Sequence, residues 1–251
     1  MEITMNKIAT TLLIIAFSYS CQSNAGTIDL SFDAGAPHNS SLVGHASVTN
    51  DMLRLTPSKN GQNGQLRLAD ADNGLDVVKW DIGFDFRFSN VGGLGAADGI
   101  GISFGRLGQF DAAMNGMTQE EGLNSGIAIG IDTWRNGGEV SGNHISVRYD
   151  GVLLQEINLS NELADGQFHR LMASMDNGHL ALSLDNNQLL SHNIINWQAY
   201  AGQFVFGGRT GGGRTLQEVD NVSVRTAAVP EPASIALLGL GLFGLLLRRK
   251  N

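Results

Sequence analysis

The amino-acid sequence predicts an all-β domain, built as a two-sheet antiparallel jelly-roll sandwich. Apolar and polar residues alternate with a period of two through most of residues 26–228, and Gly, Asn and Asp separate the alternating runs. Between the two ends of the chain, no segment of similar length carries the 3.6-residue apolar stripe of a helix. About a dozen short strands divided by such turns are typical of sandwiches and jelly rolls.

The alternation marks each expected strand in turn. In residues 85–88 and 180–184 every second residue is apolar, as a strand with one solvated face requires. Two dipeptides, Asp150-Gly151 and Asn186-Asn187, predict tight hairpin turns. The expected strands cover residues 27–32, 52–56, 64–69, 80–89, 98–105, 125–134, 144–151, 152–159, 168–176, 179–185, 203–208 and 219–226.

The first 25 residues read as a secretory signal peptide. Lys7 supplies a positive charge, residues 10–17 are mostly apolar, and small residues lead to Ala25. The apolar run is shorter than the roughly 20 residues that span a bilayer. Two alternatives stay open: a buried N-terminal helix, and cleavage before Cys21 with lipidation of that cysteine.

The C-terminal residues 229–251 have three parts in a fixed order. Pro230-Glu231-Pro232 precedes an apolar run at residues 233–247, and Arg248-Arg249-Lys250 follows it. The run predicts a transmembrane helix whose basic end stays in the cytoplasm, so that the main domain lies outside. This tail resembles the PEP-CTERM sorting signal of Gram-negative bacteria. The resemblance implies an exosortase-type processing enzyme and a location at the cell surface or in exopolysaccharide. A plain membrane anchor is the alternative.

The charge of the middle region excludes some partners. Without the charged residues of the two ends, 12 basic and 22 acidic residues remain, a net charge near −10. Nucleic acids and anionic membrane surfaces demand positive charge, so neither is an expected partner. Because the only cysteine is Cys21, the domain has no disulfide and no cysteine-based zinc site.

Four segments of the middle region carry a family resemblance. They are Ala97-Asp98-Gly99 before a strand, residues 131–144, the strand–turn–strand at 168–186, and the glycine-rich loop 207–213 with the strand after it. In this order and spacing they resemble the concanavalin A-like sandwich, in particular the L-type lectins, with a laminin-G-like character toward the end.

The resemblance implies a carbohydrate site. In the L-type lectins the aspartate that matches Asp98 accepts hydrogen bonds from sugar hydroxyls and follows a cis peptide bond. The asparagine that matches Asn136 and the backbone of a glycine-rich loop donate to the same sugar. An aromatic face adds stacking, and Trp134 is close in sequence. The implied binding residues are Asp98, Gly99, Trp134, Asn136, Gly208, Arg209 and Gly211.

This sequence departs from the lectin family at the residues that bind metal ions. The family pattern is Glu-x-Asp-x-aromatic-x-Asn, then Asp and His, and Gly130 stands at the glutamate position. The implied metal ligands are therefore a reduced set of Asp132, Asn136, Glu139 and His144. The transition-metal site, which uses the missing glutamate, is expected to be lost. The expected cofactor is none, with calcium left open although it wants six to eight oxygen ligands.

Plain structural roles also fit these residues. Asp98 could cap a turn, Trp134 could pack in the core or at a sheet edge, and His144 could be a surface or half-buried residue at the start of a strand. The loop 207–213 could be a simple connection between strands.

Three functions are weighed on this basis. A glycoside hydrolase of this fold needs two carboxylates about 5 to 10 Å apart, and the Glu-x-Asp-x-Glu signature is absent, as is a Gly-x-Ser-x-Gly elbow. The leading hypothesis is a non-catalytic, exported module that binds a polysaccharide or glycan. The competing hypothesis is a structural matrix protein without a specific ligand.

Overall fold

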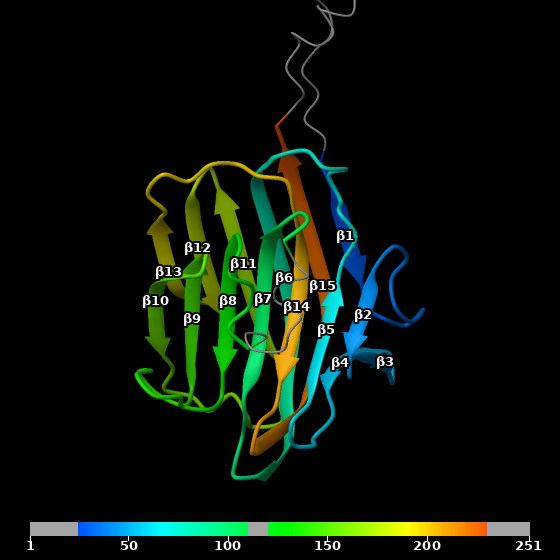
Figure 1. The fold of residues 1–251 in the computed structure, drawn as a ribbon, viewed down its shortest axis with the longest axis vertical. Coiled ribbons are helices and arrows are strands. Elements are labelled where there is room, and N and C mark those ends of the chain that lie inside the picture. The colour runs from blue at the N-terminus through cyan, green and yellow to red at the C-terminus, as the bar shows by residue number, and fades with distance from the viewer. Residues whose placement is uncertain (1–24, 110–119, 230–251) are drawn as a thin grey trace, which may run out of the picture. The chain divides into compact units, whose positions relative to one another are not determined.

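The computed structural model describes residues 25–109 and 120–229. Within these ranges every regular secondary-structure element is a β-strand (Figure 1). The secretory leader, Cys21 and the apolar run at 233–247 therefore lie outside the described residues. No helix among the described residues has the length and apolar character to cross a bilayer. The strands are β1 (Thr27–Leu30), β2 (Ser41–Gly44), β3 (Ser47–Thr49), β4 (Met52–Thr56), β5 (Asn63–Arg67), β6 (Val77–Gly93), β7 (Gly99–Arg106), β8 (Ile127–Asp132), β9 (His144–Tyr149), β10 (Val152–Asn158), β11 (His169–Asp176), β12 (His179–Leu184), β13 (Asn187–Asn193), β14 (Gly202–Arg209) and β15 (Gly213–Ala228).

The strands form two antiparallel sheets packed as a sandwich, which confirms the predicted fold class. One sheet has the order β13-β12-β11-β6-β15-β4-β3, with β1 paired to β15. The other has the order β10-β9-β8-β7-β14-β5-β2. Chain neighbours such as β6 and β7 belong to different sheets, so the chain crosses repeatedly between the two layers. Residues Ala25–Ala228 make one compact unit.

The core lies between the sheets and is rich in aromatic rings. Along β6 the inward positions hold Trp80, Phe84, Phe86 and Phe88, while Asp81, Asp85 and Arg87 alternate with them toward solvent. Trp80 meets Phe204 edge to face with ring centroids 5.4 Å apart, and Phe84 meets Phe206 at 5.2 Å. Such edge-to-face pairs stabilise a core beyond their buried area.

The strands that the alternation predicted are all present. β4 has the predicted bounds, and the others begin or end a few residues away from them. Three further strands, β2, β3 and β13, were not predicted. β2 and β3 are too short to show a clear period, and β13 is an edge strand in which polar residues surround two consecutive half-buried leucines. The closing strand β15 is also much longer than the predicted 219–226, because its first half carries polar residues on the inward face.

Tight hairpins join several neighbouring strands. Asp150 and Gly151 both have positive φ between β9 and β10, which is the predicted turn. The second predicted turn is displaced by one residue: Asp185 and Asn186 have positive φ, and Asn187 already belongs to β13.

Strand register gathers the ends of several strands at one end of the sandwich. Gly99 pairs with both Arg209 and Asp132, and Gly213 pairs with Gly93. The β6–β7 loop, the β14–β15 loop and the segment after β8 therefore lie side by side.

Candidate functional site

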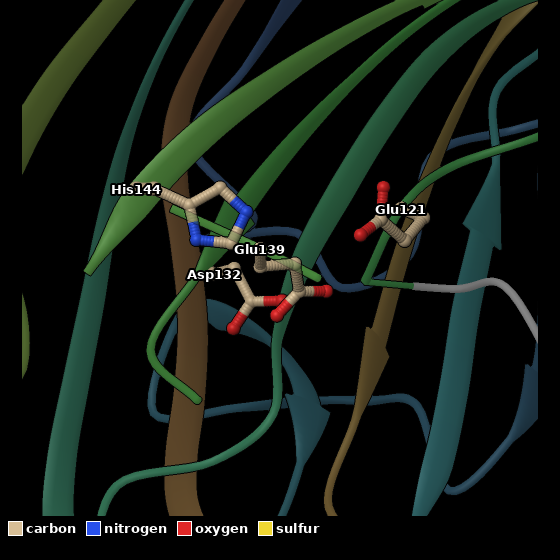
Figure 2. A group of neighbouring side chains, drawn as sticks. All are labelled: Glu121, Asp132, Glu139 and His144. Atoms are coloured by element: carbon tan, nitrogen blue, oxygen red, sulfur yellow. The ribbon is translucent and has the colours of Figure 1, made fainter. Parts of the chain in front are cut away.

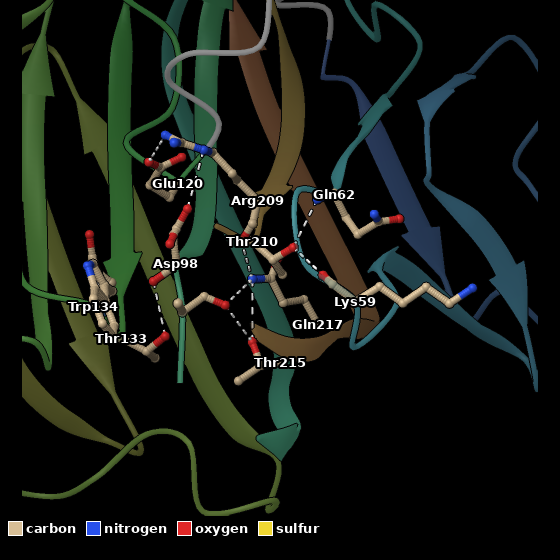
Figure 3. Close-up of polar contacts among 12 residues, drawn as sticks. Lys59, Gln62, Asp98, Glu120, Thr133, Trp134, Arg209, Thr210, Thr215 and Gln217 are labelled. Carbon is tan, nitrogen blue, oxygen red and sulfur yellow. Dashed lines mark hydrogen bonds and ion pairs between the residues drawn. The ribbon is translucent and has the colours of Figure 1, made fainter. Parts of the chain in front are cut away.

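Asp98 lies at the end of the β6–β7 loop, directly before β7 (Figure 3). The Ala97–Asp98 peptide bond is cis, as the resemblance predicted. The backbone N–H of Asp98 donates to the Arg209 carbonyl at 2.9 Å, and its carbonyl accepts from the Thr133 N–H at 2.8 Å and from the Thr133 hydroxyl at 3.0 Å. The main chain of Asp98 is thus fixed between β14 and the end of β8.

The carboxylate of Asp98 meets the glycine-rich loop. A Cβ atom added to Gly211 would lie 3.1 Å from Asp98 Oδ1, so the loop backbone approaches as closely as glycine permits. The Gly211 N–H also hydrogen-bonds to this carboxylate. Burial raises the pKa of Asp98 above its ordinary value, while Arg209 and the Gly211 N–H act in the opposite direction. Two of the predicted segments, far apart in sequence, therefore converge on one carboxylate.

Arg209 links Asp98 to a second acid that the sequence did not single out. Its guanidinium lies 3.3 Å from Asp98 Oδ2 through Nε and donates to Glu120 Oε1 at 2.7 Å through Nη1 (Figure 3). The Glu120 side chain is only 4% exposed. Burial raises the pKa of Glu120, and the neighbouring Asp98 and Glu121 add to this effect while Arg209 opposes it. No motif marks Glu120, because only the folded chain brings it to Arg209.

Buried polar side chains hold the β6–β7 loop and the β14–β15 loop in place. The Gln217 side-chain amide donates to the Arg209 carbonyl at 2.6 Å, and the Thr215 hydroxyl donates to the Ala97 carbonyl at 3.1 Å. The Thr210 hydroxyl donates to the Lys59 carbonyl at 2.6 Å and accepts from the Gln62 N–H at 3.0 Å. A signal for these residues was present in the sequence: Thr215 and Gln217 continue the inward positions of β15 with polar side chains.

Trp134 lies beside Asp98, just beyond β8 (Figure 3). It is half-buried, and a Cβ atom added to Gly95 would lie 3.7 Å from its ring. Leu94, in the same β6–β7 loop, is 74% exposed, and a side chain built on Gly212 would contact it at 3.1 Å. The β6–β7 loop thus contacts Trp134 through Gly95 and the glycine-rich loop through Leu94.

The remaining predicted binding residues are placed differently. Gly99 and Gly208 are buried strand residues: a Cβ on Gly99 would meet the Ile131 carbonyl at 2.3 Å, and one on Gly208 would meet Gln217 Oε1 at 2.4 Å. Asn136 is exposed in the segment after β8, and its N–H donates to the Glu139 carboxylate. These contacts give the two glycines a packing role and place Asn136 beside Glu139.

A second cluster lies at the same end, around the end of β8 and the start of β9 (Figure 2). Glu121, Asp132, Glu139 and His144 each offer one ligand atom, and these atoms all lie within 4.8 Å of one another. Three of the four are predicted metal ligands. Glu121 was not predicted, and Asn136 touches the cluster through its main chain.

The cluster brings three carboxyl groups together, one of them that of a buried aspartate. Burial raises the pKa of Asp132 to about 8, and the neighbouring carboxylates of Glu139, Glu120 and Glu121 add to the rise while the Trp134 N–H opposes it. His144 is fully buried rather than a surface residue, and its Nδ1 lies 2.9 Å from the Ser141 carbonyl.

Comparisons with known proteins agree with this architecture. A family model described as the legume-like lectin family matches residues 30–192, and one described as the PEP-CTERM protein-sorting motif matches residues 228–250. A search of curated protein sequences finds no match.

Solved lectin structures share the fold. The VIP36 exoplasmic/lumenal domain in its Ca2+/Man3GlcNAc-bound form has a TM-score of 0.62 at 17% identity, over 79% of this chain and 87% of that chain. The lectin from Bauhinia forficata in complex with GalNAc has a TM-score of 0.60 at 18% identity, over 82% and 99%. Winged bean acidic lectin complexed with methyl-alpha-D-galactose has a TM-score of 0.62 at 16% identity, over 81% of this chain and 98% of that chain.

Proposed function

This chain belongs to the legume-like lectin family, and from that membership we propose that its sandwich is a non-catalytic carbohydrate-binding module with its site at Asp98. The observation that carries the proposal is the convergence on the Asp98 carboxylate of the glycine-rich loop, Trp134 and the β6–β7 loop. The neighbours bound to Man3GlcNAc, GalNAc and methyl-alpha-D-galactose support a sugar as the ligand class.

The geometry suits a neutral polyol. A carboxylate accepts hydrogen bonds from hydroxyl groups, and such charge-assisted bonds are about twice as strong as neutral ones. The ion pair with Arg209 favours the ionised form of Asp98 and fixes one of its oxygens. The apolar face of a sugar ring would pack against the Trp134 ring, which lies beside Asp98. Asn136, from the exposed segment after β8, would add a donor.

The same contacts argue against glycoside hydrolysis at this place. Asp98 and Glu120 are two acids near one another, which is what a hydrolase requires. Here both contact the same guanidinium, and their side chains are only 9% exposed at Asp98 and 4% at Glu120. Neither is therefore placed to transfer a proton to a bound glycoside. Release of reducing ends from incubated polysaccharides would favour the hydrolase, and absence of any glycan binding would favour a structural matrix protein.

Calcium is a candidate ligand because several VIP36 structures are calcium-bound forms. Asp132 and Asn136, together with Glu139, would be its ligands here. Asp132 Oδ1 already accepts from the Trp134 N–H at 2.6 Å, which leaves Oδ2 as its free oxygen. Calcium wants six to eight oxygen ligands, so these three residues alone do not fit it. The proposed sugar site consequently rests on Asp98 and its neighbours and not on a bound calcium ion.

The predicted leader and the sorting motif indicate the cellular location at which the module would act. We propose three regions: a secretory leader at 1–25, the lectin domain at 26–228, and a sorting tail at 229–251. The PEP-CTERM match supports sorting by an exosortase-type enzyme. Residues 233–247 would attach the chain to the membrane before processing, on the strength of their apolar sequence alone. The mature module would then face polysaccharide at the cell surface or in the extracellular matrix.

Binding of the purified full chain to an array of neutral and acidic glycans tests the sugar site. The Asp98→Asn variant keeps the shape of the side chain and removes its charge. Hydrogen bonds to charged groups contribute about 1.5–3 kcal/mol, so we expect binding to weaken by roughly tenfold or more. Asp176→Asn is the matched control, because Asp176 is an exposed aspartate that pairs with Lys79 near the opposite end of β6. Unchanged binding by Asp98→Asn, with native circular dichroism, would contradict the site.

A further inference from the structure

Asp72, in the loop between β5 and β6, is a buried aspartate outside both clusters described above. It is only 2% exposed, and its Oδ1 accepts from the Thr226 hydroxyl at 2.8 Å. Burial raises the pKa of Asp72 and the neighbouring Asp70 adds to the rise, while hydrogen bonds from Thr226 and the Gly26 N–H oppose it. Among the described residues, the charged neighbour that shifts this pKa is therefore another acid, and no cation does so.

The loop around Asp72 is fixed by its own hydrogen bonds. Asp70 Oδ1 accepts from the Asp72 N–H at 2.9 Å, and Asp70 Oδ2 accepts from the Gly74 N–H at 2.6 Å. The Asp72 carbonyl accepts from the Leu75 N–H at 3.2 Å. The carboxylate of Asp70 is thus occupied by the backbone of its own turn, and that of Asp72 remains to meet β15.

The main-chain nitrogen of Gly26 lies at the same place. Its N–H donates to Thr226 Oγ1 at 3.1 Å, and the Gly26 carbonyl accepts from the Thr226 N–H at 3.0 Å. From Thr27 onward β1 pairs with β15, which carries Thr226 (Figure 1). The backbone of Gly26 is therefore held beside β15, with its nitrogen toward the Asp72 carboxylate.

No side chain fits at position 26. A Cβ atom added to Gly26 would lie 2.5 Å from Thr226 Oγ1, 2.6 Å from Ala71 Cβ and 3.0 Å from the Ala71 carbonyl oxygen. Gly26 is buried, whereas Ala25 directly before it is exposed. The chain thus enters the domain at the Ala25–Gly26 bond, which is the bond at which the predicted leader ends.

We propose that removal of the leader at this bond creates the partner of Asp72, the α-ammonium group of Gly26. Hydrolysis by a leader peptidase adds water across the bond and leaves a carboxylate on Ala25 and an ammonium group on Gly26. The new charge forms at the nitrogen that already contacts Thr226. It supplies the buried carboxylate with a cation and attaches the start of β1 to the sandwich in the exported chain. This inference rests on the leader proposed above and not on the sugar site.

A buried carboxylate responds differently to substitution with and without a cation. Where the cation is present, loss of the carboxylate is strongly destabilising, because it leaves the partner charge buried and unpaired. Where no cation is present, a neutral side chain of the same shape removes an unfavourable buried charge. Asp72→Asn should therefore have different effects before and after leader removal. A role limited to the hydrogen bond with Thr226 predicts equal effects instead.

Thermal unfolding of two forms of the full chain tests the proposal. One is the exported chain, and the other carries Ala25→Gln, which retains the leader because cleavage requires a small residue at this exposed position. Both are produced without an exosortase-type enzyme, so that their C-terminal tails are identical. We expect Asp72→Asn to lower the midpoint of the exported form by about 5 °C or more. In the form that retains the leader, the midpoint should stay unchanged or rise.

Asp76→Asn is the matched control, because Asp76 is an exposed aspartate in the same loop. It should leave the midpoints of both forms unchanged. Equal effects of Asp72→Asn in the two forms would overturn the proposal. Intact mass of the exported chain reports its first residue separately, and a chain that begins elsewhere than at Gly26, for example at Cys21, would overturn the proposal through the leader.

A measurement on the unaltered exported chain keeps the test decisive if Asp72→Asn fails to fold. An ammonium group held by a carboxylate reacts with acylating reagents more slowly than a solvated amine. At neutral pH the α-amine of Gly26 should therefore be labelled severalfold more slowly in the folded chain than in urea, as mass spectrometry of the N-terminal peptide measures. Equal rates in the two states would overturn the pairing, whatever the outcome of the glycan-binding assays.

Discussion

Arg209 shows how much a single side chain contributes at the residue scale. It contacts two carboxylates, one at the proposed sugar site and one that is almost inaccessible to solvent. A buried charge that loses its partner is costly, whereas a solvated pair contributes little. The stability of the Asp98 region and its readiness to bind a ligand therefore depend on the same guanidinium.

Replacing this arginine should destabilise the domain. Arg209→Gln leaves Glu120 buried without its ion pair, and we expect the free energy of unfolding to fall by roughly 2 kcal/mol. Urea denaturation followed by tryptophan fluorescence measures the change. Arg225→Gln, which breaks the exposed pair with Asp29, is the comparison and should leave the midpoint unchanged. Equal effects of the two substitutions would show that burial of Glu120 is unimportant.

The sequence foresaw some site residues and missed others for a physical reason. Asp98, Asp132 and His144 belong to local patterns whose spacing survives in a single sequence. Glu120 and Glu121 follow the segment 110–119 and belong to no such pattern, and their importance arises from the absence of a side chain at Gly130. A contact of this kind depends on the distance between segments in space, which alternation and motif spacing do not encode.

At the scale of elements, the Tyr200 hydroxyl joins the C-terminal end of β7 to the N-terminal end of β8. Its hydroxyl donates to the Phe104 carbonyl at 2.7 Å and accepts from the Ile127 N–H at 3.1 Å. Burial raises the pKa of Tyr200 well above its ordinary value, so the hydroxyl keeps its proton. The guanidinium of Arg106 covers its ring at 4.2 Å from the centroid.

Removal of this hydroxyl should weaken the β7–β8 pairing. Tyr200→Phe leaves the buried Ile127 N–H without that acceptor, and we expect a loss of about 1–3 kcal/mol in the free energy of unfolding. Tyr149→Phe is matched in chemistry but removes only a partly exposed contact with Arg106, so its effect should be smaller. Faster hydrogen exchange at Ile127 in Tyr200→Phe, measured by mass spectrometry, would locate the change. A larger effect at Tyr149 would contradict this assignment.

Strand prediction succeeded where one face of the strand is buried and missed three edge strands, β2, β3 and β13, although it found the edge strand β10. β6 and β12 alternate because one face meets the core, whereas β13 places two consecutive leucines, Leu189 and Leu190, against it and shows no alternation. The early part of β15 was missed for a different reason. Its inward residues Thr215 and Gln217 serve the loops around Asp98 instead of the apolar core.

For the whole molecule, the compact unit Ala25–Ala228 ends where the sorting motif begins. Almost all the buried apolar residues lie within one core between the two sheets, so this unit should not need the ends of the chain for its stability. Expression of the full chain in a host with an exosortase-type enzyme should yield a mature protein that lacks the tail, as intact mass measures. Its unfolding midpoint should equal that of the unprocessed chain.

A host without the enzyme provides the control for this processing. Glu231→Gln, within Pro230-Glu231-Pro232, should retain the tail in either host, because it alters the motif and leaves the domain unchanged. Removal of the tail from this variant, or in the host without the enzyme, would show that another protease is responsible.

β15 spans the sandwich from one end to the other. The strand starts at Gly213, beside the loop that contacts Asp98, and finishes at Ala228, and its 16 residues cover roughly 50 Å at the usual rise per residue. Asp98 and the last residue of the compact unit Ala25–Ala228 therefore lie at opposite poles of the sandwich.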